Sequence, residues 1–127
     1  MTANDDQTGN LSQAMAHARE LMEREPQQAL LQLSEILAVV PDYTPATLLK
    51  TALLRQLADP NEALEQLMPV LRTHPDSAEV LLEEGWSLSG LRWGAEAVAA
   101  LERVVAGLPD HPEALRLLAD HAAAAVD

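Results

Sequence analysis

The sequence PQQALLQLSEILAVVP at residues 26–41 returns as PNEALEQLMPVLRTHP at residues 60–75 and as GAEAVAALERVVAGLP at residues 94–109. The copies begin at residues 26, 60 and 94, and we call the constant interval between these starting positions the repeat length. Three positions of each copy hold an alanine, a leucine and a terminal proline: Ala29, Leu33 and Pro41, then Ala63, Leu67 and Pro75, then Ala97, Leu101 and Pro109. An interval of this size, held at several independent positions, indicates stacked helical hairpins.

Prolines and capping residues divide the chain into seven predicted helices, because proline suits the first turn of a helix and stops one further on. The predicted ranges are 11–24, 27–39, 45–57, 60–73, 78–91, 94–107 and 112–125. Four pairs have capping-box spacing: Asn10 and Gln13, Asp59 and Glu62, Asp76 and Glu79, and Asp110 and Glu113. We expect a disordered lead-in at 1–9 and one domain at 10–127, with repeats at about 10–43, 44–77 and 78–111 and a closing helix at 112–127.

Composition narrows the class of protein. Hydrophobic residues make up 48% of the 127 residues but aromatic residues only 2%, which is typical of Leu- and Ala-rich packed helices. The absence of cysteine excludes disulfides and thiolate metal sites. No apolar run is long enough for a membrane span, and the acidic start is unlike a secretory signal, so we expect a cytoplasmic protein with no membrane partner. The net charge of −12 argues against a nucleic-acid partner.

The chain resembles the tetratricopeptide repeat (TPR) family, on the alanine, leucine and proline positions quoted above. The first helix of each predicted pair matches the family pattern less well than the second. In the third pair Gly85 and Leu88 fit the pattern. The equivalent places hold Thr51 and Leu54 in the second pair and His17 and Glu20 in the first. No tryptophan or tyrosine occupies its usual family place. The resemblance implies an all-α fold, a right-handed α-solenoid of three antiparallel helix pairs plus a capping helix, seven helices in all.

In this family the first helices of the pairs line the concave face, where ligands lie. The resemblance therefore implies a partner-binding set at Ala14, Ala18, Leu48, Ala52, Arg55, Leu82, Trp86, Ser89 and Arg116. For Leu48 and Leu82 a core position is an equal alternative. Trp86 is the strongest candidate, because tryptophan is enriched among interface hot spots, although it could also pack against a neighbouring helix. Trp93 is predicted to staple the turn between paired helices.

Two further expectations concern charge. The Lys, Arg and Asn clamp with which some TPR domains hold acidic chaperone tails is absent, since its places fall on small or apolar residues such as Ala14 and Ala52. A partly apolar segment, such as a helical one, fits this face better than a free carboxylate. Lys50 and Glu84 are one repeat length apart on adjacent first helices, and either pair as an inter-repeat salt bridge or extend into solvent.

We expect no catalysis, cofactor or metal site, because the four histidines lack helical metal-ligand spacing and no glycine-rich phosphate loop is present. The predicted function is a protein-interaction module that binds a protein or peptide segment, with a homodimer through the C-terminal helix as a further prediction. Two alternatives stay open. Residues 109–127 are similar in style to the repeats of bacterial TPR-containing sulfotransferases, which implies a larger multidomain enzyme, and TPR-type secretion chaperones are also small and acidic.

Overall fold

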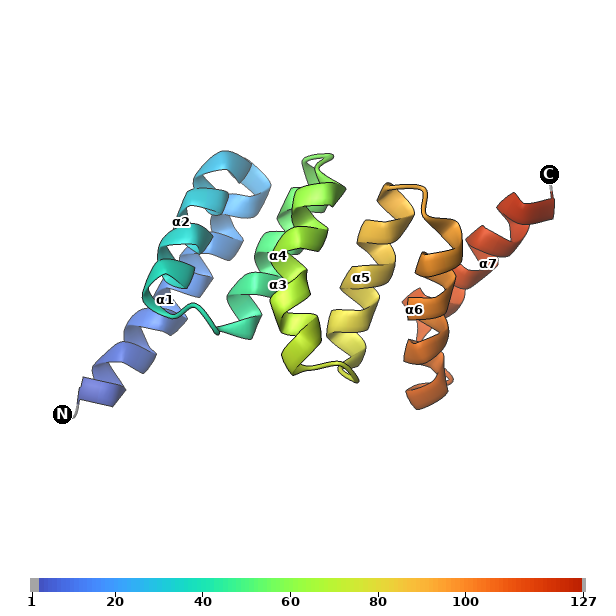
Figure 1. Ribbon diagram of the computed structural model, residues 1–127. Coiled ribbons are helices and arrows are strands. Elements are labelled where there is room, and N and C mark those ends of the chain that lie inside the picture. The colour runs from blue at the N-terminus through green and yellow to red at the C-terminus, as the bar shows by residue number, and fades with distance from the viewer. Residues whose placement is uncertain (1–2, 127) are drawn as a thin grey trace.

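Seven helices make up the computed structural model, which describes the backbone of residues 3–126 and the side chains of residues 10–125. They are α1 (Ala3–Arg24), α2 (Pro26–Val39), α3 (Thr44–Gln56), α4 (Pro60–Thr73), α5 (Ala78–Gly90), α6 (Gly94–Gly107) and α7 (Pro112–Val126). No strand is present within residues 3–126. Figure 1 shows the helices as a row of hairpins that runs from α1 at one end to α7 at the other.

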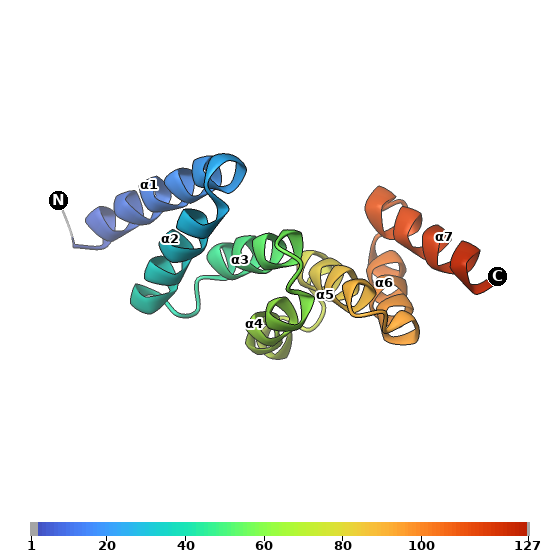
Figure 2. The same cartoon turned by 90° about the horizontal axis from the view of Figure 1, so that it is seen from above.

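The helices stack as a solenoid. Each helix packs against the next one in the chain, and α3 also contacts α5, the first helix of the following pair. Seen from above, α1, α3, α5 and α7 lie along one side of the row, and α2, α4 and α6 along the other (Figure 2). The ends of the row bend toward the side of the odd-numbered helices, which we call the inner face. The predicted all-α solenoid of three helix pairs and a closing helix is confirmed.

The second helix of each pair supplies the most completely buried positions. Their side chains are 0% exposed in all three copies: Ala29, Ala63 and Ala97, together with Leu33, Leu67 and Leu101. The alanines let neighbouring helices approach closely, and the leucines fill the space between them. Each buried leucine contributes about 2 kcal/mol through removal of apolar surface from water. The repeated sequence is therefore the seam that holds the pairs together.

The turn inside a pair differs between the repeats. In the second and third pairs three residues separate the helices, 57–59 and 91–93, and the middle one is left-handed, with φ 63° at Ala58 and at Arg92. The amide N–H of the residue after the left-handed one then donates a hydrogen bond to the carbonyl five positions earlier, as in the 2.9 Å bond from the Asp59 amide to the Leu54 carbonyl. In the first pair only Glu25 lies between the helices, and its φ is −141°.

This short link displaces α1 from the register of the other first helices. The places one repeat before Thr51 and Leu54 are His17 and Glu20, and both are exposed, whereas Thr51 and Leu54 are buried. The buried residues of α1 are instead Met15 and Ala18, at 2% and 0% exposure. The poor family match at His17 and Glu20 thus follows from a turn that is two residues shorter, and α1 still presents an apolar stripe to the core.

Helix starts follow the capping prediction only in part. Asp59 caps α4 as expected, where its carboxylate accepts a 3.3 Å bond from the Glu62 amide. For α5 the cap is Ser77 rather than Asp76, and for α7 the ring nitrogen of His111 rather than Asp110 accepts the bond from the Ala114 amide. Asn10 lies inside α1, which begins at Ala3 where a disordered lead-in over 1–9 was expected. Residues 3–10 contain no proline, the residue that interrupts a helix most strongly.

Candidate functional site

Three side chains from three first helices meet on the inner face. The guanidinium carbon of Arg55, on α3, lies 4.8 Å from the centre of the Trp86 ring, on α5. The guanidinium carbon of Arg116, on α7, lies 5.5 Å from the same ring. Both distances are within the range of cation–π attraction, which contributes about 0.5–2 kcal/mol per contact. We call Arg55, Trp86 and Arg116 the Arg–Trp–Arg cluster.

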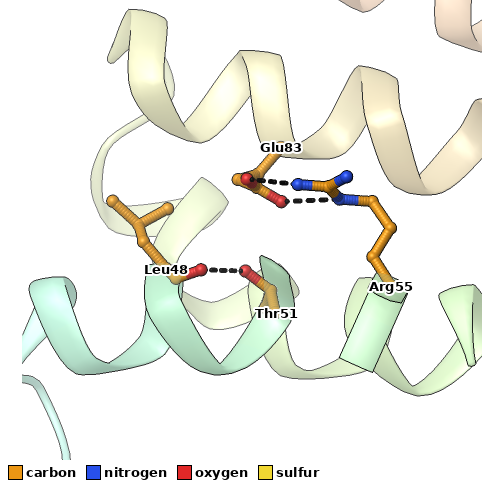
Figure 3. Close-up of polar contacts among 4 residues, drawn as sticks. All are labelled: Leu48, Thr51, Arg55 and Glu83. Atoms are coloured by element: carbon orange, nitrogen blue, oxygen red, sulfur yellow. Dashed lines mark hydrogen bonds and ion pairs between the residues drawn. The ribbon is translucent and has the colours of Figure 1, made fainter. Parts of the chain in front are cut away.

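Arg55 is held by a second, charged contact. Its Nε and Nη2 donate hydrogen bonds of 3.2 and 3.1 Å to the two carboxylate oxygens of Glu83, on α5 (Figure 3). A guanidinium matches a carboxylate in this two-point geometry, so the orientation of Arg55 is fixed as well as its position. Both side chains are largely shielded from solvent. Glu83 therefore balances the charge of Arg55, and the pair links the second repeat to the third.

Arg116 is placed differently from Arg55. It is exposed, and among the described residues it makes no ion pair and no side-chain hydrogen bond. Arg116 thus brings an unbalanced positive charge to the inner face of a chain whose net charge is −12. Its five N–H donors thus have no acceptor among the side chains that the structure describes.

Trp86 combines both roles that the sequence left open. It is half-buried, and together with Leu82 it packs against a core cluster, with members Leu81, Leu101, Val104, Ala114 and Leu117. Its remaining surface faces the arginines. A large ring that is anchored on one side and partly exposed on the other offers a rigid contact surface that loses little conformational entropy on binding.

Ser89, also on α5, contacts α7. Its Oγ donates a 2.8 Å bond to the carbonyl of Gly85 and lies 2.8 Å from Nε2 of His121, on α7. Because a hydroxyl has one proton, both bonds form together only when Nε2 of His121 carries the donated hydrogen. This direction is opposite to that of a serine nucleophile, which gives its proton to histidine. The contact therefore links α7 to α5. His121 belongs to this part of the inner face, although the sequence did not indicate it.

The two predicted residues on α1 do not join the cluster. Ala18 is fully buried in the core of the first pair, so it cannot line an exposed face. Ala14 lies in a hollow of about 470 Å³ between α1 and α2, beside residues such as Glu35 and Val39. Both lie one repeat length before α3 residues of the predicted set, and the short link at Glu25 breaks that equivalence. On α3, Leu48 and Ala52 are half-buried.

Of the two alternatives for Lys50 and Glu84, the inter-repeat salt bridge is wrong, because the two residues form no ion pair in the structure. Glu84 instead lines a hollow of about 380 Å³ with Leu64 of α4 and Arg103 of α6. Helix α4 packs against both α3 and α5. Burial raises the pKa of Glu84 above its usual 4.5, and the nearby Arg103 guanidinium only partly offsets this.

Trp93 lies away from the inner face. It is 51% exposed and lines the same hollow as Glu84. Its amide donates a 3.0 Å bond to the Leu88 carbonyl, which closes the turn between α5 and α6. The backbone of Trp93 thus contributes to the turn while its ring remains open to solvent. The two tryptophans of the chain report on two different surfaces.

Within residues 3–126 no helix combines the length and apolarity needed to cross a bilayer. The described His, Asp and Glu side chains form no group of three that could hold a metal ion.

Comparison with known proteins rests on structures. No protein-family model matches the chain, and no curated protein matches its sequence. MamA (residues 41 to the end) from Desulfovibrio magneticus RS-1 matches with a TM-score of 0.82 and 19% identity, over 92% of this chain and 67% of that one. The MamA RS-1 ArsTM double mutant gives 0.78 and 20%, over 87% and 62%. The P58(IPK) TPR domain gives 0.80 and 18%, over 94% and 34%.

This chain thus spans from about one third to two thirds of the matched structures. At these identities the similarity concerns the fold. The chain has a TPR-like helical-repeat fold, as the resemblance read from the alanine, leucine and proline positions implied.

Proposed function

We propose that this chain is a protein-interaction module that binds a peptide or protein segment along its inner face. The observation that carries the proposal is the Arg–Trp–Arg cluster, in which α3, α5 and α7 each contribute one side chain to a single partly exposed surface. The helical-repeat fold supports it, because stacked pairs provide an extended curved surface rather than a closed pocket. The matched P58(IPK) structure is itself a TPR domain.

The chemistry of the cluster favours a partly apolar segment that also carries hydrogen-bond acceptors. Trp86 and Leu82 form the apolar base. Arg116 offers free N–H donors beside that base, which suit main-chain carbonyls or the carboxylate of a side chain. Arg55 is oriented by Glu83, so its guanidinium is already ordered before a ligand arrives. Such preorganisation lowers the entropic cost of binding.

A binding role explains these residues better than catalysis does. The Ser89 hydroxyl donates to the Gly85 carbonyl and also contacts His121, so a link between α5 and α7 accounts for this pair. A partner that is a protein or peptide segment, rather than a nucleic acid, also agrees with the charge of −12. The readings as a sulfotransferase repeat region and as a secretion chaperone remain predictions.

Affinity capture with paired tryptophan variants tests the proposal. The immobilised chain, Trp86→Ala and Trp93→Ala would each be exposed to lysate, and bound proteins compared quantitatively. Loss of a central aromatic anchor costs about 2 kcal/mol, or about 30-fold in affinity, so Trp86→Ala should lose the captured partner. Trp93→Ala removes an equally large ring from the outer side and should retain it. Capture that survives Trp86→Ala but fails with Trp93→Ala would contradict the proposal.

Arg116→Ala sharpens the result. Arg116 has no ion-pair partner among the described side chains, so its removal leaves no buried charge behind. The fold should be retained and only the contact to the ligand lost. Arg55→Ala should lower capture and also destabilise the fold, because it leaves the partly buried Glu83 carboxylate without its partner.

A further inference from the structure

The hollow of about 380 Å³ beside Glu84 and Trp93 lies among α4, α5 and α6. Side chains of all three helices line it, together with Trp93 of the turn that joins α5 to α6. Figure 2 shows α4 and α6 on the side of the row opposite the inner face. We call this space the outer hollow, and it is separate from the Arg–Trp–Arg cluster.

Part of the outer hollow is apolar and open to solvent. Leu64 and Met68 are one turn apart on α4 and therefore share one face of that helix. Met68 is 44% exposed and Trp93 is 51% exposed, so a flexible thioether side chain and a rigid ring both remain uncovered. Large apolar side chains that are left exposed together at a concave place are typical of a contact surface.

The charged part of the outer hollow is negative. Glu84 of α5 and Glu96 of α6 both line it, and neither makes an ion pair with a described residue. Arg103 also lines it, but its guanidinium donates a 2.7 Å bond to the Pro75 carbonyl and a 3.4 Å bond to the Asp76 carboxylate. The only arginine among the lining residues is thus engaged by acceptors outside the hollow, while the two glutamates are left without a salt-bridge partner.

Glu84 is the glutamate that a cation would stabilise most. It is half-buried, whereas Glu96 is exposed. Burial raises the pKa of Glu84, and the Arg103 guanidinium offsets this only in part. The ionised carboxylate of Glu84 therefore has less solvation than it would have in water, and a cation beside it would supply the missing stabilisation.

The second pair does not repeat this combination. One repeat length before Glu84 and Trp93 are Lys50 and Asp59, so a base replaces the acid and a carboxylate replaces the ring. The exposed ring and the unpaired carboxylate are therefore specific to the third pair. Stacking of the helices does not require them, in contrast to the recurring alanine and leucine positions.

We propose that the outer hollow binds an arginine side chain of a partner protein, whose guanidinium pairs with Glu84 and stacks on Trp93. The aliphatic part of the arginine covers Leu64 and Met68. A guanidinium suits this place because it is planar, matches a carboxylate with two N–H donors and stacks on aromatic rings. A basic partner also complements the net charge of −12.

This site is independent of ligand binding at the inner face, since it shares no residue with the Arg–Trp–Arg cluster. One side chain at a partly exposed site binds with a dissociation constant of about 1 mM. A contact of this strength does not retain a protein through capture from lysate by itself. Trp93→Ala therefore remains a valid control for the inner face.

Nuclear magnetic resonance of the whole ¹⁵N-labelled chain tests the proposal, with Nα-acetylarginine amide as the probe. Both ends of this molecule are uncharged, so it presents an arginine side chain as a protein does. The indole N–H signal of Trp93 should shift with a saturable curve, and that of Trp86 should not. Nα-acetylcitrulline amide, a neutral analogue of the same shape, should give no saturable shift.

Two glutamine variants separate a local contact from general attraction to an acidic protein. Glu84→Gln should weaken binding of the probe about tenfold, because it removes a charged hydrogen-bond acceptor. Glu102→Gln is the matched control: it changes the net charge equally, but Glu102 is exposed on α6 and does not line the hollow. The same spectra show whether each variant is folded, so lost binding is distinguished from lost structure.

Several outcomes would overturn the proposal. One is a Trp93 signal that does not respond to the probe, and another is equal weakening by Glu84→Gln and Glu102→Gln. Tighter binding of Nα-acetylleucine amide would mean that the hollow takes an apolar side chain instead. Displacement of the probe by spermidine at a much lower concentration would identify a free polyamine as the occupant. Failure of the inner-face proposal is read separately, from Trp86.

Discussion

The first and third helix pairs share one sequence period and differ in the turn inside the pair. In both, the second helix buries its alanine and leucine completely, Ala29 and Leu33 in one and Ala97 and Leu101 in the other. The first helices do not match. Three residues join α5 to α6, whereas Glu25 alone joins α1 to α2, and the buried positions of α1 leave the repeat register.

The difference has a consequence for function. Helices α3, α5 and α7 each contribute a side chain to the Arg–Trp–Arg cluster, while the predicted residues of α1 lie in the core or beside α2. The seam made by the second helices fixes how the pairs stack. The length of the turn inside a pair then decides which residues of the first helix reach the inner face.

The largest expected change in stability is at a buried position where the second and third pairs differ. Thr51 and Gly85 are equivalent, but a Cβ on Gly85 would lie 2.8–2.9 Å from the fully buried Leu101 side chain. Gly85→Thr should therefore lower the free energy of unfolding by about 3 kcal/mol, measured by urea denaturation. Gly107→Ala is the control, because its Cβ would meet nothing within 4 Å. Equal stability of Gly85→Thr and the parent chain would mean that α5 and α6 are not closely packed.

A smaller effect should separate the two kinds of turn. Ala58 and Arg92 have φ 63°, a conformation that costs about 1 kcal/mol for residues other than glycine. Ala58→Gly and Arg92→Gly should each raise the midpoint of thermal unfolding, with a gain of about 0.5–1 kcal/mol. Glu25→Gly should give no gain, because φ at Glu25 is −141° and glycine there only adds freedom to the unfolded chain. A gain at all three positions would erase the distinction between the turns.

The smallest effect concerns pH. Because burial raises the pKa of Glu84, the folded chain holds this proton more tightly than the unfolded chain. The contribution is fully present below pH 4.5 and is lost as the pH rises through the higher pKa of the folded state. Glu84→Gln should remove this part of the slope, so its stability relative to the parent increases between pH 4.5 and 7.5 in urea titrations. An unchanged difference across that range would show that Glu84 is well solvated.

Much of the fold was predictable from the sequence, because the alanine, leucine and proline positions recur at an interval that only stacked hairpins explain. The register of α1 was not, since a one-residue link at Glu25 leaves no mark in the repeated second helix. The inner face was predicted on α3, α5 and α7, where Arg55, Trp86 and Arg116 do come together. Glu83 and His121 were not predicted. Glu83 contacts Arg55 and His121 contacts Ser89, and each pair is separated by less than one repeat length. A comparison of equivalent positions therefore does not connect them.

The most direct test of the account uses the two tryptophans as separate reporters while the captured partner segment is titrated. In Trp93→Phe the tryptophan fluorescence, excited selectively, comes from Trp86 alone, and it should change with saturation as the ligand covers the inner face. In Trp86→Phe the tryptophan fluorescence comes from Trp93 alone, and it should stay constant because that ring lies on the outer side. A ligand that changes Trp93 and leaves Trp86 unaffected would contradict the inner face as the binding surface.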